Sequence, residues 1–220
     1  YFQATRGGGH GDYRTIVLAP WSVQEIHDFT YLAFDLADRY RNPVLVLADG
    51  VIAQLLEPVR LKPAKKRFPE KKWVLDGCAG RKPRSIRSLF LSPGVLETHN
   101  WKIAEKLAKI EKREVRYQTY RTDGMDYLVV AFGTCARIAR EAVDEARRSS
   151  IKVGLFRPIT LWPFPYRQLG SAIERAKKVL VVEMNLGQML DDVRIAGQGR
   201  SRIFFYGRPG GGIPTPEEIL

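Results

Sequence analysis

Short apolar runs alternate with an amphipathic stretch along the first 58 residues. The runs at 15–18 (TIVL) and 44–48 (VLVLA) each fit a buried strand. Between them, apolar residues recur at intervals of three and four from Ile26 to Tyr40, which predicts a helix that ends before Asn42–Pro43. A strand, a helix and a strand joined by short connections predict a right-handed βαβ unit with parallel strands.

Ser22 and Glu25 precede that pattern and predict how the helix begins. Ser22 is a suitable N-cap, and Glu25 three positions later completes the spacing of a capping box. Two strands alone do not form a stable sheet. We therefore expect residues 1–58 to be the C-terminal part of a domain whose other strands are absent here or come from a partner. We also expect an exposed apolar sheet edge near residues 15–48.

Residues 59–123 have a different pattern, which predicts a connector. The first part is basic, contains prolines and has no periodicity, so we expect an extended segment that lies over a surface. An amphipathic stretch from Val95 to about Arg116, with interspersed charges, predicts a helix that is partly solvated. The connector thus has one helix and is not expected to form a domain.

Residues 124–220 show a regular alternation of two patterns. Four apolar runs predict strands at 127–132, 151–156, 179–184 and 203–206. Helical patterns separate these runs at about 135–148, 165–176 and 187–196, and Thr215–Pro216 begins another helix. The alternation predicts the α/β fold class, with a small doubly wound sheet in this part of the chain.

The composition argues against a membrane-spanning protein, a secreted protein and a protein that holds an iron–sulfur cluster by itself. The chain has 220 residues, 45% of them hydrophobic, and no apolar run long enough to cross a membrane. Its polar, glycine-rich start predicts no signal peptide, and the missing initiator methionine suggests part of a longer chain. Cys78 and Cys135 fit a reducing cytoplasm. Two cysteines alone cannot hold an iron–sulfur cluster, which normally takes four thiolates.

The positive charge is concentrated in one segment. Eleven basic and three acidic residues lie between Glu57 and Arg87, which gives this segment +8 of the chain's net +12. A binding module for nucleic acid would be one explanation, but aromatic residues are few here and no known binding module surrounds the segment. We therefore expect a connector that rests on an acidic neighbouring surface, and not a segment that binds nucleic acid.

Arg6-Gly-Gly-Gly-His-Gly-Asp12 is the densest polar loop. Its glycines allow close approach of the backbone to a ligand, and His10 could donate to an oxyanion or a carbonyl. No nucleophile or second metal ligand lies nearby in the sequence, so we expect neither a catalytic triad nor a metal site. A simple surface turn is the alternative.

Two further turns follow predicted strands. Phe132-Gly-Thr-Cys135 could bind phosphate on free backbone N–H groups, with the Cys135 pKa lowered at a helix N-terminus, although a plain strand–helix joint filled by small residues is favoured. In Glu183-Met-Asn-Leu-Gly-Gln188, Asn185 and Gln188 could orient a neighbouring chain or ligand. Alternatively, Asn185 is an N-cap and Gln188 occupies the third helical position.

The loop from Arg157 to Pro165 contains three prolines and Trp162, which is too specific for a generic connection. If the sheet is parallel, this loop and the one after residue 183 lie at the carboxyl edge, where α/β proteins usually meet ligands or partners.

Seven segments together resemble one family. They are ATRGGGHGDYR (4–14), APWSVQE (19–25), YRNPVLVLAD (40–49), GLFRPITLWPFP (154–165), VEMNLGQM (182–189), YGRPGG (206–211) and PTPEEI (214–219). In order and over nearly all 220 residues, they resemble the alpha subunit of thiamine-dependent 2-oxoacid:ferredoxin oxidoreductases, most closely the branched-chain (2-ketoisovalerate) type.

The resemblance implies a pyrimidine-binding domain whose C-terminal part is residues 1–58, a basic connector over 59–123, and a transketolase C-terminal-like domain over 124–220. It implies oxidative decarboxylation of a 2-oxoacid to an acyl-CoA on thiamine pyrophosphate, with Mg²⁺ and the diphosphate held by a beta subunit. It further implies iron–sulfur clusters on beta and ferredoxin-like (gamma/delta) subunits, and electron transfer to ferredoxin.

The resemblance assigns no catalytic residue to this chain, because the family's activating glutamate lies upstream. It implies that Arg6, His10, Gly11 and Asp12 face the active site or a subunit interface, and that Arg157, Trp162, Asn185 and Gln188 form an interface or fix loops. The chain alone is expected to be inactive. The alternatives are a transketolase or 2-oxoacid dehydrogenase beta-type chain, and a non-catalytic module that binds an acidic macromolecule.

Overall fold

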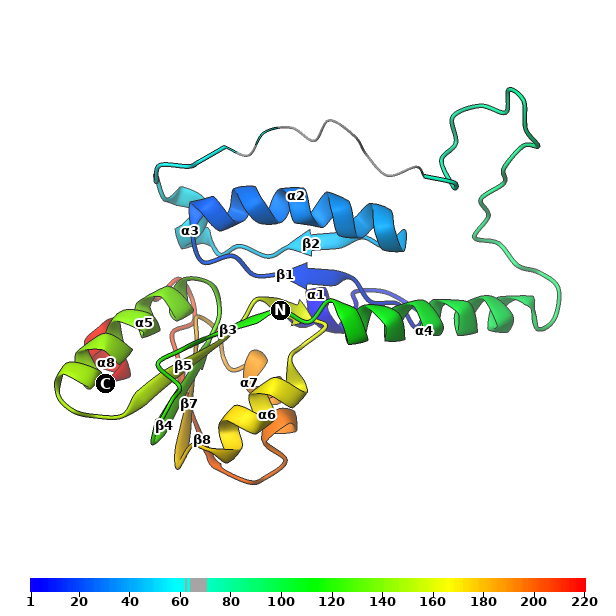
Figure 1. Ribbon diagram of the computed structural model, residues 1–220. Coiled ribbons are helices and arrows are strands. Elements are labelled where there is room, and N and C mark those ends of the chain that lie inside the picture. The colour runs from blue at the N-terminus through cyan, green and yellow to red at the C-terminus, as the bar shows by residue number, and fades with distance from the viewer. Residues whose placement is uncertain (62, 64–70) are drawn as a thin grey trace.

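A computed structural model describes residues 1–61, 63 and 71–220 (Figure 1). Its first sheet has the strand order β2-β1-β6. β1 (Ile16–Leu18) and β2 (Val44–Val46) pair in parallel and are connected by α2 (Val23–Tyr40), as the βαβ pattern predicts. The third strand is β6 (Thr160–Trp162), which pairs antiparallel with β1. The expectation that neighbouring strands are absent or come from a partner is therefore wrong on that side of β1.

The second sheet has the order β3-β5-β4-β7-β8. Its parallel strands are β5 (Val153–Pro158), β4 (Tyr127–Ala131), β7 (Lys178–Glu183) and β8 (Arg202–Gly207). β3 (Tyr117–Tyr120) adds to β5 in the antiparallel direction. The expectation that residues 59–123 form only a connector with one helix is therefore wrong for this stretch, whose mostly exposed side chains show no apolar run.

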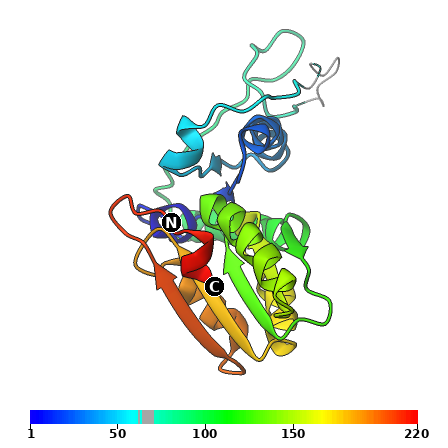
Figure 2. The ribbon, with the colours of Figure 1, turned by 90° about the vertical axis from the view of Figure 1, so that its left-hand side faces the viewer.

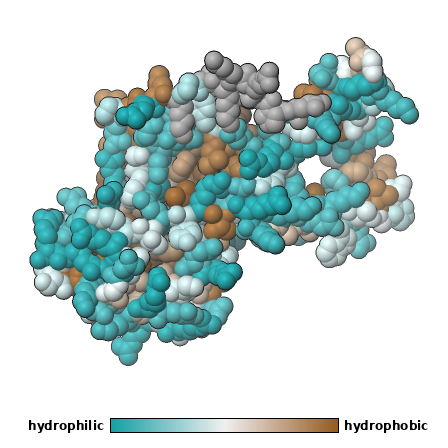
Figure 3. Space-filling model, viewed as in Figure 1, coloured by the Kyte–Doolittle hydropathy of each residue, from teal (hydrophilic) through white to brown (hydrophobic). Residues whose placement is uncertain are grey.

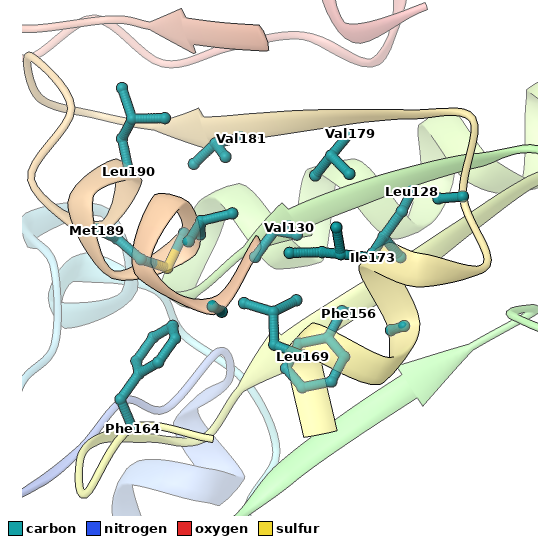
Figure 4. Close-up of a cluster of buried hydrophobic side chains, with 14 of the residues drawn as sticks. Leu128, Val130, Phe156, Phe164, Leu169, Ile173, Val179, Val181, Met189 and Leu190 are labelled. Atoms are coloured by element: carbon teal, nitrogen blue, oxygen red, sulfur yellow. The ribbon is translucent and has the colours of Figure 1, made fainter. Parts of the chain in front are cut away.

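Helices cover both faces of the second sheet (Figure 2). α5 (Gly133–Arg148) and α8 (Pro216–Ile219) lie on one face, and α6 (Tyr166–Glu174) and α7 (Met189–Gly197) lie on the other. On the α6–α7 face, Leu169, Ile173 and Met189 pack against strand residues such as Val130 and Val181 (Figure 4). These layers confirm the predicted α/β fold class with a doubly wound sheet.

The remaining helices join the first sheet to the rest of the chain. α1 (Phe2–Arg6) and the five-residue α3 (Gly50–Gln54) are short, whereas α4 (Val95–Arg113) has 19 residues and packs Ile110 into the core around β1. No described helix has the length and apolar character needed to cross a membrane.

Between the first sheet and α4, the described residues 71–94 form a projecting arm without helix or strand (Figure 1). Large apolar side chains are exposed along it, including Leu89 at 70% and Leu91 at 83%, and Trp101 on α4 is 66% exposed. Hydrophobic surface is visible on this arm in the space-filling view (Figure 3). Other parts of the basic segment fall on residues 62 and 64–70, outside the described residues.

Candidate functional site

The carboxyl edge of the second sheet faces the first sheet. The strand order changes direction around β4, whose neighbours are β5 and β7, and a doubly wound sheet usually binds its ligand at such a switch point. Here that place is filled by the chain itself, because Tyr1 packs its ring against Phe132 directly after β4. The edge that the sequence suggested for a ligand or partner is therefore mainly an internal junction.

Arg157, at the end of β5, ties the two sheets together. Its side chain is 0% exposed and forms an ion pair with Glu25 of α2. It also donates to the Ala19 carbonyl oxygen at 3.1 Å, and its guanidinium lies 4.1 Å from the centre of the Trp21 ring. Burial lowers the pKa of Arg157, and the Glu25 carboxylate opposes that shift.

Glu25 consequently departs from the predicted capping box. Its backbone N–H donates to Ser22 Oγ at 3.2 Å, so Ser22 is the N-cap of α2. The Glu25 carboxylate instead accepts the Trp21 N–H at 3.0 Å and pairs with Arg157. The hydrogen bond from the Glu25 N–H to Ser22 is therefore present, whereas the Glu25 carboxylate contacts Trp21 and Arg157 instead of the Ser22 N–H.

Trp162 lies in β6, where it pairs with Val17 of β1 and is 7% exposed. Through β6, three residues of the proline-rich loop form the third strand of the first sheet. The hydroxyl of Thr160, two residues earlier, accepts the Arg116 N–H at 2.9 Å and so fixes the chain just after α4. Within this chain, the loop organises contacts between its two halves.

The loop after β7 is held by its own polar side chains. Asn185 Oδ1 accepts the N–H groups of Gly187 and Gln188, at 2.7 and 3.0 Å. The buried Glu183 carboxylate accepts the N–H groups of Met189 and Leu190 at the start of α7. Asn185 is thus not the N-cap, as one of the two interpretations had it: α7 begins later, and Glu183 supplies the acceptors.

Two further side chains of that loop, Glu183 and Gln188, differ in their surroundings: Glu183 is buried, and Gln188 contacts α1. Burial raises the pKa of the Glu183 carboxyl, although the N–H donors around it favour the charged form. The side-chain oxygen of Gln188 accepts the Phe2 N–H at 3.3 Å, which attaches the loop to α1.

Arg6 forms an ion pair with Asp192, which is not among the predicted site residues. Asp192 of α7 is fully buried and accepts from Arg6 at 2.8 Å and from the hydroxyls of Tyr1 and Tyr166. Burial and Asp192 raise the pKa of both tyrosines. The sequence did contain a signal, because Asp192 occupies the same helical face as the buried Met189, Val193 and Ala196.

The other residues of the predicted loop lie at the surface of the described structure. His10, Gly11 and Asp12 are exposed, and Tyr13 anchors the loop by accepting the Gly8 N–H on its hydroxyl at 2.8 Å. Gly11 has a φ of 92°, which favours glycine. The structure thus separates Arg6 from the exposed residues that follow it.

The turn at Gly133-Thr134, which could have bound a phosphate, instead binds the carboxylate of Asp49 from the same chain. Asp49, after β2, accepts the Thr134 N–H at 2.9 Å and the Thr134 hydroxyl at 2.7 Å. A Cβ at Gly133 would lie 2.8 Å from the Asp49 carboxylate. The described geometry supports a strand–helix joint whose free N–H group is satisfied by Asp49.

Cys135 is expected to be unreactive in the native protein. Burial, together with the carboxylates of Asp49 and Glu183, raises the pKa of its thiol to about 12, so the interpretation with a lowered pKa is wrong. Iodoacetamide at pH 8 should alkylate the exposed Cys78 rapidly and Cys135 only after denaturation, as peptide mass spectrometry would show. Equal alkylation of both cysteines in the native protein would contradict this expectation.

A cleft of about 680 Å³ opens beside Arg6. Its walls come from α1, the C-terminal end of α4, the chain from Trp162 to Phe164, and the first turn of α6. Arg14, Lys112 and Arg167 line it as well. The cleft therefore brings together the two segments that the sequence marked as unusual, namely the N-terminal loop and the proline-rich loop.

Two sequence models of known families match the chain, one on each half. Residues 2–122 match the model for pyruvate flavodoxin/ferredoxin oxidoreductase, thiamine diphosphate binding. Residues 125–219 match pyruvate:ferredoxin oxidoreductase core domain II. The chain belongs to the 2-oxoacid:ferredoxin oxidoreductase family.

Individual members of this oxidoreductase family match almost the whole chain. Ketoisovalerate oxidoreductase subunit VorB of Methanothermobacter marburgensis is 43% identical over 221 residues, which is 100% of this chain and 62% of the relative. 2-Oxoglutarate synthase subunit KorA of Methanocaldococcus jannaschii is 33% identical, over 97% of this chain and 64% of the relative. The chain thus spans less than two thirds of the length of these relatives.

A solved structure shares the fold. It is a 2-oxoglutarate:ferredoxin oxidoreductase from Magnetococcus marinus with 2-oxoglutarate, coenzyme A and succinyl-CoA bound. The TM-score is 0.79 at 25% identity, over 99% of this chain and 43% of that chain. The two sheets and their junction therefore belong to the architecture of this oxidoreductase family.

Proposed function

We propose that this chain is part of the alpha subunit of a cytoplasmic 2-oxoacid:ferredoxin oxidoreductase. The enzyme would convert a branched-chain 2-oxoacid such as 2-ketoisovalerate to its acyl-CoA and pass the electrons to ferredoxin. The observation that carries the proposal is the 43% identity with a ketoisovalerate oxidoreductase subunit over the whole chain. Identity with 2-oxoglutarate synthase subunits is lower, at 31–34%.

We propose that thiamine pyrophosphate is shared with a beta subunit. When bound, this cofactor would supply the nucleophilic and electron-accepting chemistry that decarboxylation of a 2-oxoacid requires. In the described part of the chain, no three His, Cys, Asp or Glu side chains are grouped so that they could hold a metal ion. The Arg6–Asp12 loop is largely open to solvent, so it fits a surface that other parts of the enzyme cover, and not a complete cofactor site.

We propose that the partner subunits carry the Mg²⁺ site and the iron–sulfur clusters, and that the arm helps to bind them. Exposed Leu89, Leu91 and Trp101 give this region apolar surface, while the surrounding segment is strongly basic. Exposed apolar surface of this kind commonly marks an interaction site. An acidic partner face with apolar pockets would match both features, whereas nucleic acid would match only the charge.

The test is an assay of the full-length subunit purified with its partner subunits under anaerobic conditions. We expect reduction of a low-potential dye that requires both 2-oxoacid and coenzyme A, with a higher kcat/KM for 2-ketoisovalerate than for pyruvate or 2-oxoglutarate. Omission of coenzyme A is the matched control. Absence of reduction with every 2-oxoacid, or partners without iron–sulfur clusters, would instead favour a transketolase or dehydrogenase-type chain.

A further inference from the structure

The cleft beside Arg6, called here the basic cleft, is lined by four cationic side chains. They are contributed by three separate parts of the chain and are Arg6, Arg14, Lys112 and Arg167. Glu111 is the one carboxylate in its lining. The basic cleft therefore has an excess of three positive charges, counted over its lining residues.

Three of these cations have no carboxylate partner in the described part of the chain. Arg6 is paired with the buried Asp192, but no ion pair joins Arg14, Lys112 or Arg167 to a described carboxylate. Arg14 donates instead to the carbonyl oxygens of Arg6 and Tyr13, which positions its guanidinium at the wall of the cleft. These charges are available to an anion.

The inner wall is apolar. It is formed by Trp162, the last residue of β6, and by Pro163 and Phe164 in the connection to α6, and all three are buried. Small-molecule sites typically combine such a wall with a few placed polar groups, in cavities of about 300–1,000 Å³. An acidic protein surface would need only the positive charges, whereas this cleft also offers a volume of about 680 Å³ and an apolar wall.

We propose that the basic cleft binds a phosphorylated small molecule of about nucleotide size. Its phosphate groups contact Arg14, Lys112 and Arg167, and its non-phosphate part lies against the wall formed by Trp162 and Phe164. Arginine forms forked hydrogen bonds with phosphate oxygens, and lysine adds a compact positive charge. The site follows from the described side chains and does not depend on the proposed oxidoreductase activity.

The probes are ADP, pyrophosphate and adenosine, titrated calorimetrically into the purified complex of full-length subunits without 2-oxoacid or electron acceptor. ADP should bind most tightly, pyrophosphate more weakly, and adenosine least. Lys112→Gln and Arg167→Gln should each weaken ADP binding by about tenfold, because each removes a charge-assisted contact. Arg148→Gln, which removes an exposed charge from α5 outside the cleft, should leave ADP binding unchanged.

A second measurement locates the bound ligand. Photolysis of 8-azido-ADP on the complex should label a peptide that contains residues 162–168, and excess ADP should suppress that labelling. Failure of ADP and pyrophosphate to bind at millimolar concentration would overturn the proposal. Equal ADP affinity in Lys112→Gln, Arg167→Gln and the unmodified complex would overturn it too, whatever the outcome of the oxidoreductase assay.

Discussion

Glu25→Gln should lower the free energy of unfolding by about 3 kcal/mol, because breaking a buried ion pair leaves an uncompensated charge. The Arg157 side chain is 0% exposed and would keep only neutral acceptors, the Ala19 carbonyl and Gln118. Glutamine preserves the shape of Glu25 but removes its charge and replaces one of the two acceptor oxygens, which accept from Arg157 and the Trp21 N–H, by an NH₂ donor. Urea unfolding followed by fluorescence would measure it, since Trp21 lies against the guanidinium.

Two controls separate this buried pair from an ordinary one. Glu174→Gln removes the carboxylate of a surface pair with Arg200, whose side chains are 48% and 54% exposed, and should cost less than about 1 kcal/mol. Adding Arg157→Met to Glu25→Gln should recover part of the loss, because the unpaired charge is then gone. Equal losses in Glu25→Gln and Glu174→Gln would show that the contact between the sheets contributes little.

The local elements could be predicted from the sequence because they depend on residues that are close along the chain. The helix from Ile26 to Tyr40 and the four parallel strands of the second sheet follow from the apolar pattern of the sequence. The same applies to Thr215, whose side chain accepts the Glu218 N–H in a complete capping box. In these cases, the residues that decide the structure are at most a few positions apart.

β6 could not be predicted, because its partner lies about 140 residues away. Thr160–Trp162 is too short for a recognisable strand pattern, and its pairing with β1 depends on how the two halves of the chain meet. The partners of the buried Asp192 could not be predicted either. Its position on the apolar face of α7 is a signal of burial, but Arg6 and Tyr166 reach it from other elements that are distant along the chain.

The candidate site was predictable in part. The Arg157–Pro165 loop was identified as special, and the structure shows contacts that join it to β1 and α2. For the Arg6–Asp12 loop, the glycines indicated backbone freedom, but nothing in the spacing showed that Arg6 would turn inward while His10 and Asp12 stay exposed. Whether those residues face an active site or a subunit interface stays a prediction.

Asp49→Ala is the second substitution with a large expected effect, a loss of about 3 kcal/mol in the free energy of unfolding. Asp49 accepts the N–H groups of Val51 and Ile52 at the start of α3, at 3.1 and 3.0 Å. It also binds the N–H and hydroxyl of Thr134 at the start of α5, which has no cap from its own N-cap residue. One cap is typically worth about 1 kcal/mol, and a hydrogen bond to a charged group somewhat more.

The expected loss divides between the two helices, and a second variant can separate them. Thr134→Val removes the hydroxyl but keeps the Thr134 N–H, so it should cost about 1 kcal/mol, a fraction of the Asp49→Ala effect. Asp123→Ala removes an exposed carboxylate outside both caps and should change stability by less than about 0.5 kcal/mol. Urea unfolding of the three variants would measure these differences. If Asp49→Ala were no more destabilising than Asp123→Ala, Asp49 would not be what holds the start of α5 against the first sheet.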